Sequence, residues 1–510
     1  MTHLSPSHNV YWTRGRCLAG SLCERTWQVR NKAMKISRRN FVKSATLFGV
    51  ACYGGSTAWA ADSGKERLRM GVLSDIHIRC DKPEQGEMFR KALEYFRDRG
   101  VDAVLLAGDI ADTGRVAELE ICANVWYSVF PNGKAPDGRP VEHLFVLGNH
   151  CVDGWRNPHY RSPSTDEQAR LADAIGYADV RQKTWRRLFH EDFQPIWMKT
   201  VKGYPVIGAH WEKSDGGIRI EEFMKAHAKE IDPSLPFFYT QHEHPKDTVM
   251  GPWAWGHDDG RSTRALAAFP NAVAFSGHSH YSLTDERSIW QGAFTSINAS
   301  SLYYGSNEYA LRENGRDNAF GYTGEKRARR MKALGLSQCR QGQFVTVYDD
   351  RIDIDRLDFI SGMALGDKWV LPLPVAEKKP FDFAARRAAR VAPEFASGAR
   401  VSVAIRKDGE GAEFVDVTFP HAETKNKCRV FEYEVTAALE ADEVDLIQAQ
   451  RRVLAPDFYS LDEPSFHRSG LCTFLSKDLT LKGPYRFTVR PIECFGAKGR
   501  PIASELVKIA

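Results

Sequence analysis

The sequence predicts a layered α/β or α+β domain followed by an all-β sandwich. Apolar runs typical of buried strands alternate with helix-like segments from residue 68 to about residue 300. Beyond about residue 395, apolar and polar residues alternate with a period of two, which is typical of strands with one buried face.

The first domain opens with an apolar run at 68–74, and residues 87–97 have the apolar spacing of a helix. Residues 101–109, "VDAVLLAGD", form a continuous apolar run, as strands buried on both faces do. A second helix-like segment covers about 115–130, and the next strand is expected at 142–150.

Proline and charged residues interrupt the pattern near 368–395, so we expect the first domain to end there. The C-terminal strands are expected around 401–405, 415–419, 431–435 and 485–489. Residues 484–502 resemble the final hairpin of fibronectin type III domains, in which a Gly-containing turn follows a tyrosine-bearing strand. The predicted organisation is an N-terminal extension with a signal peptide (1–60), an α/β domain (61–380), a linker (381–395) and a fibronectin type III-like β-sandwich (396–510).

Polar residues of similar chemistry follow five of the apolar runs in the first domain. Ligands bind beyond the carboxyl ends of strands in such sheets, so the five strand ends should converge. A purely structural account gives no reason for Asp, Asn and His to recur at all five. These residues are Asp75 and His77, Asp109, Asn149 and His150, His242 and His244, and His278 and His280.

The fifth strand end reads "AFSGHSHYS" (274–282). On a strand, positions i and i+2 point to the same side, so His278 and His280 would project together. A His-x-His pair alone is weak evidence for a metal, because histidine has several other uses. As the fifth of five such strand ends, the pair indicates a metal-binding cluster.

The net charge of +5 is unevenly distributed, since residues 1–60 hold nine Lys/Arg and one acidic residue. Residues 61–510 therefore carry a net charge of −3. This mildly acidic remainder gives no electrostatic reason to expect a nucleic-acid partner.

The N-terminal segment has the pattern of an export signal. A basic start from Met34 is followed by an apolar stretch from about Ala45 to Ala58 and by the small-residue site Ala58-Trp59-Ala60. The stretch "SRRNFVK" resembles the twin-arginine signal, which implies the twin-arginine export machinery as a partner and a bacterial periplasmic location. The alternative is a basic arm followed by an ordinary helix. No later run of 18 or more apolar residues exists, so no stable membrane insertion is expected after cleavage.

Seven of the ten cysteines lie beyond residue 61, and they form no CxxC pair or zinc-type spacing. Because an oxidising compartment permits disulfides, one bridge among Cys428, Cys472 and Cys494 is an open expectation.

The residues at the strand ends mix carboxylate and amide oxygens with imidazoles, a set that suits Mn, Fe or Zn. Roughly seven candidate ligands exceed the three or four of a single tetrahedral zinc site. One carboxylate can bridge two ions about 3.5–4 Å apart, which clamp the attacking and leaving oxygens in phosphoryl transfer. We therefore expect two divalent or trivalent ions of Mn, Fe or Zn.

The order of these motifs resembles that of the calcineurin-like metallophosphoesterases over about residues 68–360. The resemblance implies a two-sheet β-sandwich flanked by helices. The motifs are Asp75-x-His77, Gly108-Asp109, Gly148-Asn149-His150, His242 and Gly277-His278-x-His280.

The resemblance also implies a role for each residue. Asp109 would bridge the two metals, and His150 would be the catalytic residue, assisting the leaving group or stabilising the transition state. One metal would be held by Asp75, His77, Asp109 and His280, and the other by Asp109, Asn149, His242 and His278.

Three positions depart from the family pattern. Members often carry an acid after Gly-Asn-His, and here Cys151 stands there, which leaves the orientation of His150 open. Asp112 stands where purple acid phosphatases have a tyrosine, which argues against an iron-tyrosinate site. The fourth motif reads His242-Glu243-His244-Pro245 in place of His-x-Pro. We expect His242 as the ligand and keep His244 as the alternative.

Segments 157–161 and 301–309 are candidate substrate-contacting loops. Arg156 or Arg161 is a candidate phosphate contact, although each is more often an ordinary surface arginine.

Together these patterns predict an exported phosphoesterase that hydrolyses phosphate mono- or diesters through attack by a metal-bound hydroxide, with a small phosphoester as substrate. A cyclic-nucleotide or glycerophosphodiester phosphodiesterase would use the same motifs. A non-catalytic, metal-containing binding protein is the alternative from a different class, and it would have little need for a non-ligand histidine such as His150.

Overall fold

The computed structural model describes residues 64–156, 173–211, 219–252, 254–306, 316–317, 336–425, 428–441, 444–455, 458 and 469–509. The chain divides into two compact units, residues 1–62 and 63–510, and every described residue belongs to the second. The predicted signal peptide and the candidate loop 157–161 lie outside the described residues.

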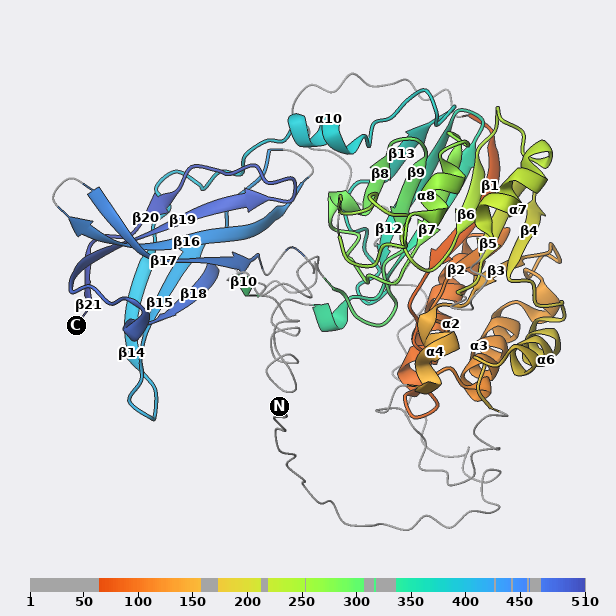
Figure 1. Ribbon diagram of the computed structural model, residues 1–510, viewed down its shortest axis with the longest axis horizontal. Coiled ribbons are helices and arrows are strands. Elements are labelled where there is room, and N and C mark those ends of the chain that lie inside the picture. Colours follow the sequence, from red (N-terminus) through yellow and green to blue (C-terminus); the bar gives the residue numbers. More distant parts are fainter. Residues whose placement is uncertain are drawn as a thin grey trace, which may run out of the picture. The chain divides into compact units, whose positions relative to one another are not determined.

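Two mixed six-stranded sheets form the N-terminal α/β region (Figure 1). In the first sheet β1, β2 and β3 run parallel while β11, β12 and β13 are antiparallel. Its strands in spatial order are β13 (Trp369–Pro372), β12 (Arg351–Asp358), β11 (Gln341–Tyr348), β1 (Glu66–Leu73), β2 (Ala103–Ala107) and β3 (Glu142–Val146). The second sheet has the order β4 (Ile196–Val201), β5 (Tyr204–Ala209), β6 (Phe237–Thr240), β7 (Ala272–Ser276), β9 (Thr295–Asn298) and β8 (Ile289–Gln291).

The two sheets pack face to face, and helices cover their outer faces. Val72 and Leu105 of the first sheet share one buried cluster with Phe238 and Phe275 of the second. The outer face of the first sheet packs against α2, α3 and α6, and that of the second against α7 and α8 (Figure 1). The helices are α2 (Pro83–Asp98), α3 (Val116–Val129), α4 (Asn149–Asp153), α6 (Ala178–Phe189), α7 (Ile220–His227), α8 (Arg261–Leu266) and α10 (Phe383–Ala388). The predicted fold class is confirmed.

The buried strands follow from the continuous apolar runs, since β2, β6 and β7 have no exposed residue. Helix α2 begins at Pro83, four residues before the predicted start, because proline fits the first turn of a helix. Its Phe89, Leu93 and Phe96 have helical spacing and are buried against the sheet. None of the helices in the described part of the chain is long and apolar enough to cross a membrane.

The C-terminal β region consists of two sheets around a core of its own. The predicted period of two is observed, with Val415, Val417 and Phe419 buried against Tyr433 and Phe487. Strands β14 to β21 pair antiparallel with one another, whereas β10 pairs parallel with β17. These strands are β14 (Ser402–Lys407), β15 (Glu413–Pro420) and β18 (Ser469–Leu475) in one sheet, and β10 (Arg316–Asp317), β17 (Val444–Leu454), β16 (Val430–Ala441), β19 (Gly483–Glu493), β20 (Ile502–Ala503) and β21 (Val507–Ile509) in the other.

One predicted strand of this region is buried less than expected. Ile405 on β14 is exposed, because β14 lies at the edge of its sheet and pairs only with β15 among the described strands. No disulfide links the seven described cysteines, so the bridge considered from the sequence is not observed among them. Cys428 and Cys494 nevertheless place their Sγ atoms within 4.8 Å of each other.

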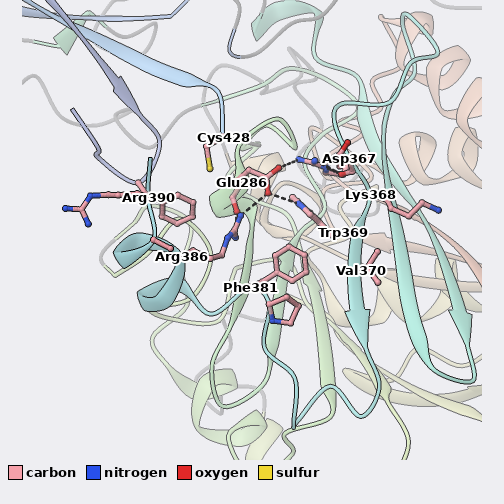
Figure 2. Close-up of a pocket in the computed structure, with 13 residues that line it drawn as sticks. Glu286, Asp367, Lys368, Trp369, Val370, Phe381, Arg386, Arg390 and Cys428 are labelled. Carbon is pink, nitrogen blue, oxygen red and sulfur yellow. Dashed lines mark hydrogen bonds and ion pairs between the residues drawn. The ribbon is translucent and has the colours of Figure 1, made fainter. Parts of the chain in front are cut away.

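The segment predicted as a linker contains α10, which is tied to the α/β region by a buried ionic network (Figure 2). Glu286 accepts hydrogen bonds from Arg386 of α10 at 2.9 Å and from Trp369 at 3.1 Å, and forms an ion pair with Arg356 at 2.8 Å. The side chains of Glu286, Arg356 and Trp369 are buried beside a cavity of about 440 Å³. All three donors thus share one carboxylate, and the two guanidinium groups also donate to backbone carbonyls.

We predict that Glu286→Ala lowers the free energy of unfolding by about 3–5 kcal/mol, because it removes the carboxylate that pairs with the buried Arg356 guanidinium. Guanidinium chloride denaturation of the purified variants measures this. Glu66→Ala removes an exposed ion pair with Arg69 and is the control, with an expected loss below about 1 kcal/mol. A loss this small for Glu286→Ala would show that the network does not stabilise the fold.

Candidate metal centre

The five predicted strand ends converge at one edge of the two sheets. Strands β1, β2 and β3 are parallel, so the loops after them leave the first sheet on the same side. The backbone N–H of Asp75 donates to Gly108 O at 3.1 Å, and that of His77 to Asp109 O at 2.9 Å. The loops after β6 and β7 of the second sheet add His242 and His278.

The backbone at this edge is unusual. Asp75, His77, Asp109, His278 and His280 all have positive φ, between 44° and 67°. Residues other than glycine adopt this left-handed conformation in only a few per cent of cases, at a cost of order 1–3 kcal/mol each. Five such residues in one cluster indicate a site that the surrounding fold holds in place.

The glycine before the third motif is required by close approach. A Cβ atom on Gly148 would lie 2.2 Å from Oδ1 of Asp109, so only glycine fits there. The backbone N–H of His150 then donates to the same Oδ1 at 2.8 Å. The motif Gly-Asn-His therefore places its loop directly against Asp109.

The first half of the centre is formed by Asp75, His77 and His280. Nε2 of His280 lies 3.0 Å from Oδ1 of Asp75 and 3.1 Å from Nε2 of His77. Oδ1 of Asp75 is buried and has no hydrogen-bond partner. A buried carboxylate oxygen facing two imidazole nitrogens fits a bound cation, because such an atom is otherwise costly to bury.

The second half is formed by Asp109, His242 and His278. Asn149 directly follows Gly148, which lies against Asp109. Nε2 of His242 lies 3.0 Å from Oδ2 of Asp109 and 3.2 Å from Nδ1 of His278. Oδ1 of Asn149 is also buried without a hydrogen-bond partner. Asp109 lies between the halves, since its Oδ2 is also 3.8 Å from Nε2 of His77.

Hydrogen bonds outside the cluster orient three of the imidazoles. His77 donates from Nδ1 to Asp112 at 2.7 Å, His242 from Nδ1 to Ala107 O at 2.8 Å, and His280 from Nδ1 to Tyr304 O at 3.0 Å. The Nε2 atom of each ring therefore faces the carboxylates. This arrangement is typical of metal-binding histidines, and the residues present fit a pair of metal ions.

The alternative ligand His244 points elsewhere. Its two ring nitrogens form hydrogen bonds with Ser276 and Ser279, both at 2.6 Å, and its ring stacks on that of Tyr281. His244 has no nitrogen left for a metal, so the geometry favours His242.

Asp112 connects His77 with His150, and sequence reasoning missed this role. Its Oδ1 lies 3.1 Å from Nδ1 of His150 and accepts the hydrogen bond from His77. Asp112 also fixes the His150 ring through its backbone carbonyl, at 2.9 Å. Cys151, which occupies the acid position of the family pattern, is buried and accepts from the Ala111 N–H. Asp112 thus supplies the orientation that Cys151 cannot.

The buried charges shift the pKa values at the centre. Burial raises the pKa of the Asp112 carboxyl, but the hydrogen bonds from His150 and His77 outweigh it and hold that pKa well below its usual range. Burial lowers the pKa of His242, yet the charges of Asp109 and Asp75 raise it to about 9. Burial also lowers the pKa of His77, but its interactions with Asp112 and Asp75 raise that pKa to about 10. These shifts favour the protonated forms of His77 and His242 beside the carboxylates, and a cation bound there would displace those protons.

Two local expectations from the sequence were wrong. His278 and His280 do not project together from a strand, because β7 ends at Ser276 and both histidines adopt left-handed backbone. Their rings contact different halves of the centre, His278 beside His242 and His280 beside His77. His150 lies in the first turn of α4 and not on a strand end.

Aromatic residues surround the centre. Trp255 stacks on His278 at 4.8 Å, and Tyr304 packs against His280 at 4.3 Å. Arg156 is exposed and pairs with Asp153 at 3.1 Å, which fits an ordinary surface arginine. Arg161 and residues 307–309 lie outside the described residues.

Residues 68–282 match the sequence profile of the family described as calcineurin-like phosphoesterase. This span contains all seven candidate ligands and His150. Residues 68–282 belong to a calcineurin-like metallophosphoesterase domain. A search of curated proteins found no match.

Solved structures similar to the chain include three with related descriptions. A conserved protein from Streptococcus pneumoniae, described as a predicted phosphoesterase, has 14% identity and a TM-score of 0.26, covering 60% of this chain and 97% of its own. A dimetal phosphatase from Danio rerio has 11% identity and a TM-score of 0.32, and the match covers 60% of this chain and 99% of that one. A purple acid phosphatase from yellow lupin (Lupinus luteus) has 12% identity and a TM-score of 0.35, and the match covers 59% of this chain and 53% of that one.

Proposed function

We propose that the protein is a phosphoesterase with two metal ions that hydrolyses phosphate mono- or diesters. The observation that carries the proposal is the buried Asp/His cluster in two halves around Asp109, inside the metallophosphoesterase domain. Hydrolysis of p-nitrophenyl phosphate and bis-p-nitrophenyl phosphate with added Mn, Fe or Zn, before and after chelation, tests it. The absence of metal-dependent turnover with every metal would refute it.

In this proposal the residues divide into ligands and a catalytic residue. Two bound ions would supply an activated water and positive charge for the phosphoryl oxygens. Asp109 would be the shared ligand. Asp75, His77 and His280 would complete one site, and Asn149, His242 and His278 the other.

His150 is suited to act on the leaving group. Its Nδ1 is occupied by Asp112, so the proton it offers must come from Nε2. Its side chain is 31% exposed, which leaves the ring accessible to a substrate. Burial lowers its pKa, but the charge of Asp109 and the hydrogen bond to Asp112 raise it above the usual value and favour the protonated acid. A metal site without catalysis would not need this arrangement.

We predict that His150→Ala retains both metals and lowers kcat for alkyl phosphoesters by about 10²–10⁴-fold, the usual contribution of positioned proton transfer. The loss should be much smaller for p-nitrophenyl esters, because nitrophenolate leaves without a proton. Kinetics on both ester types, with metal content by mass spectrometry, measure this.

His150 also lies within reach of a metal held by His77 and Asp109. If His150→Ala loses a metal ion, the residue is a ligand and the role proposed here is wrong. If alkyl-ester turnover is unchanged with both metals present, His150 has no catalytic role.

We also propose that the protein is exported to the bacterial periplasm by the twin-arginine route. "SRRNFVK" followed by a small-residue cleavage site supports this proposal. Replacing Arg38 and Arg39 with lysine should leave the protein in the cytoplasm upon cell fractionation. Undiminished periplasmic protein from that variant would contradict the export route.

A further inference from the structure

An exposed indole lies beside the second half of the metal centre. The ring of Trp255 stacks on that of His278, with centroids 4.8 Å apart and planes 21° apart. Trp255 is 36% exposed. The other large apolar side chains that are exposed among the described residues are all aliphatic. An exposed aromatic surface next to a catalytic centre indicates a binding surface.

The loop that carries Trp255 is anchored. Tyr281 donates its hydroxyl hydrogen to the backbone oxygen of Trp255 at 2.9 Å. The backbone N–H of His244 donates to the backbone oxygen of Gly256 at 2.8 Å. Ala254 packs on a small cluster of Val249, Met250 and Tyr281. The exposure of Trp255 is therefore not the result of a loosely held loop.

Gly256 brings this loop against the histidine-bearing segment. Its φ is +88°, and a Cβ atom there would lie 2.9 Å from Cβ of Ser279, the residue between His278 and His280. The loop thus fixes the indole close to His278 before any substrate binds.

The aromatic residues beside His77 and His280 in the first half of the centre are engaged differently. Tyr303 and Tyr304 are half-buried, Tyr304 O accepts the hydrogen bond that orients His280, and the Tyr303 hydroxyl accepts from Lys82 at 3.2 Å. These tyrosines support the centre, whereas Trp255 presents aromatic surface to solvent.

We propose that Trp255 is a stacking surface for the organic part of the substrate, and that the preferred substrates are phosphoesters with a flat, unsaturated ring near the phosphate. The inference rests on the proposed function of the same centre. An indole face attracts another π-face through stacking, and each stacked base typically strengthens binding by about 5- to 150-fold. An aliphatic group of similar size lacks this stacking contribution.

Adenosine 5′-monophosphate and ribose 5-phosphate test the inference, because they share a primary alkyl leaving group and differ by one ring system. Binding of each to the metal-loaded protein is measured by calorimetry, and kcat/KM is measured where turnover occurs. The wild-type protein should bind the nucleotide at least about 10-fold more tightly. Trp255→Ala should bring the ratio of the two affinities close to one, and Trp255→Phe should retain most of it.

Two controls separate stacking from damage to the centre. Metal content and affinity for ribose 5-phosphate should be unchanged in Trp255→Ala, and Leu235→Ala, which removes another exposed apolar side chain, should behave as wild type. A wild-type ratio near one, or a ratio that survives Trp255→Ala, would overturn the inference. A protein that binds with the expected ratio but hydrolyses no ester with any metal would refute the proposed function and leave the stacking role standing.

Discussion

The centre depends on how the negative charge of two buried carboxylates is compensated. Asp75 and Asp109 are at most 1% exposed, and each faces imidazole nitrogens from both sheets. Buried carboxylates are tolerated only when they are paired or bind a cation, because their hydration is lost. Oδ1 of Asp75 has no hydrogen-bond partner, although Nε2 of His280 lies 3.0 Å from it. A pair of metal ions between the carboxylates and the imidazoles would satisfy this oxygen and is the simplest account of the cluster.

The fold brings these groups together by placing the carboxyl ends of strands from both sheets at one edge. Parallel strands β1, β2 and β3 direct Asp75, Asp109 and Asn149 to it, and β6 and β7 direct His242 and His278. Left-handed backbone at five of the candidate ligands and the close approach at Gly148 then fix the side chains. Local strain of this kind persists only where the packed sheets beneath it hold the loops.

The sequence predicted this edge well because each ligand is local to the end of a strand. An apolar run followed by Asp, Asn or His can be recognised without knowing which strands are neighbours. The layered fold and the C-terminal β region could be predicted for the same reason, since periodicity is a local property.

Contacts between loops could not be predicted in this way. Asp112 supports His150 across 38 residues, and Trp255 reaches His278 through a loop whose anchors are non-local. The choice between His242 and His244 depended on two serines more than 30 residues away. The expectation for His278 and His280 failed because a period-two argument does not hold once the chain leaves the strand.

The most direct test of the account is anomalous X-ray diffraction from crystals of the metal-loaded protein. The account predicts two peaks about 3.5–4 Å apart on either side of Asp109, one next to His77 and His280 and the other next to His242 and His278. A single peak, a peak bound to His244, or no peak at this edge of the sheets would contradict it.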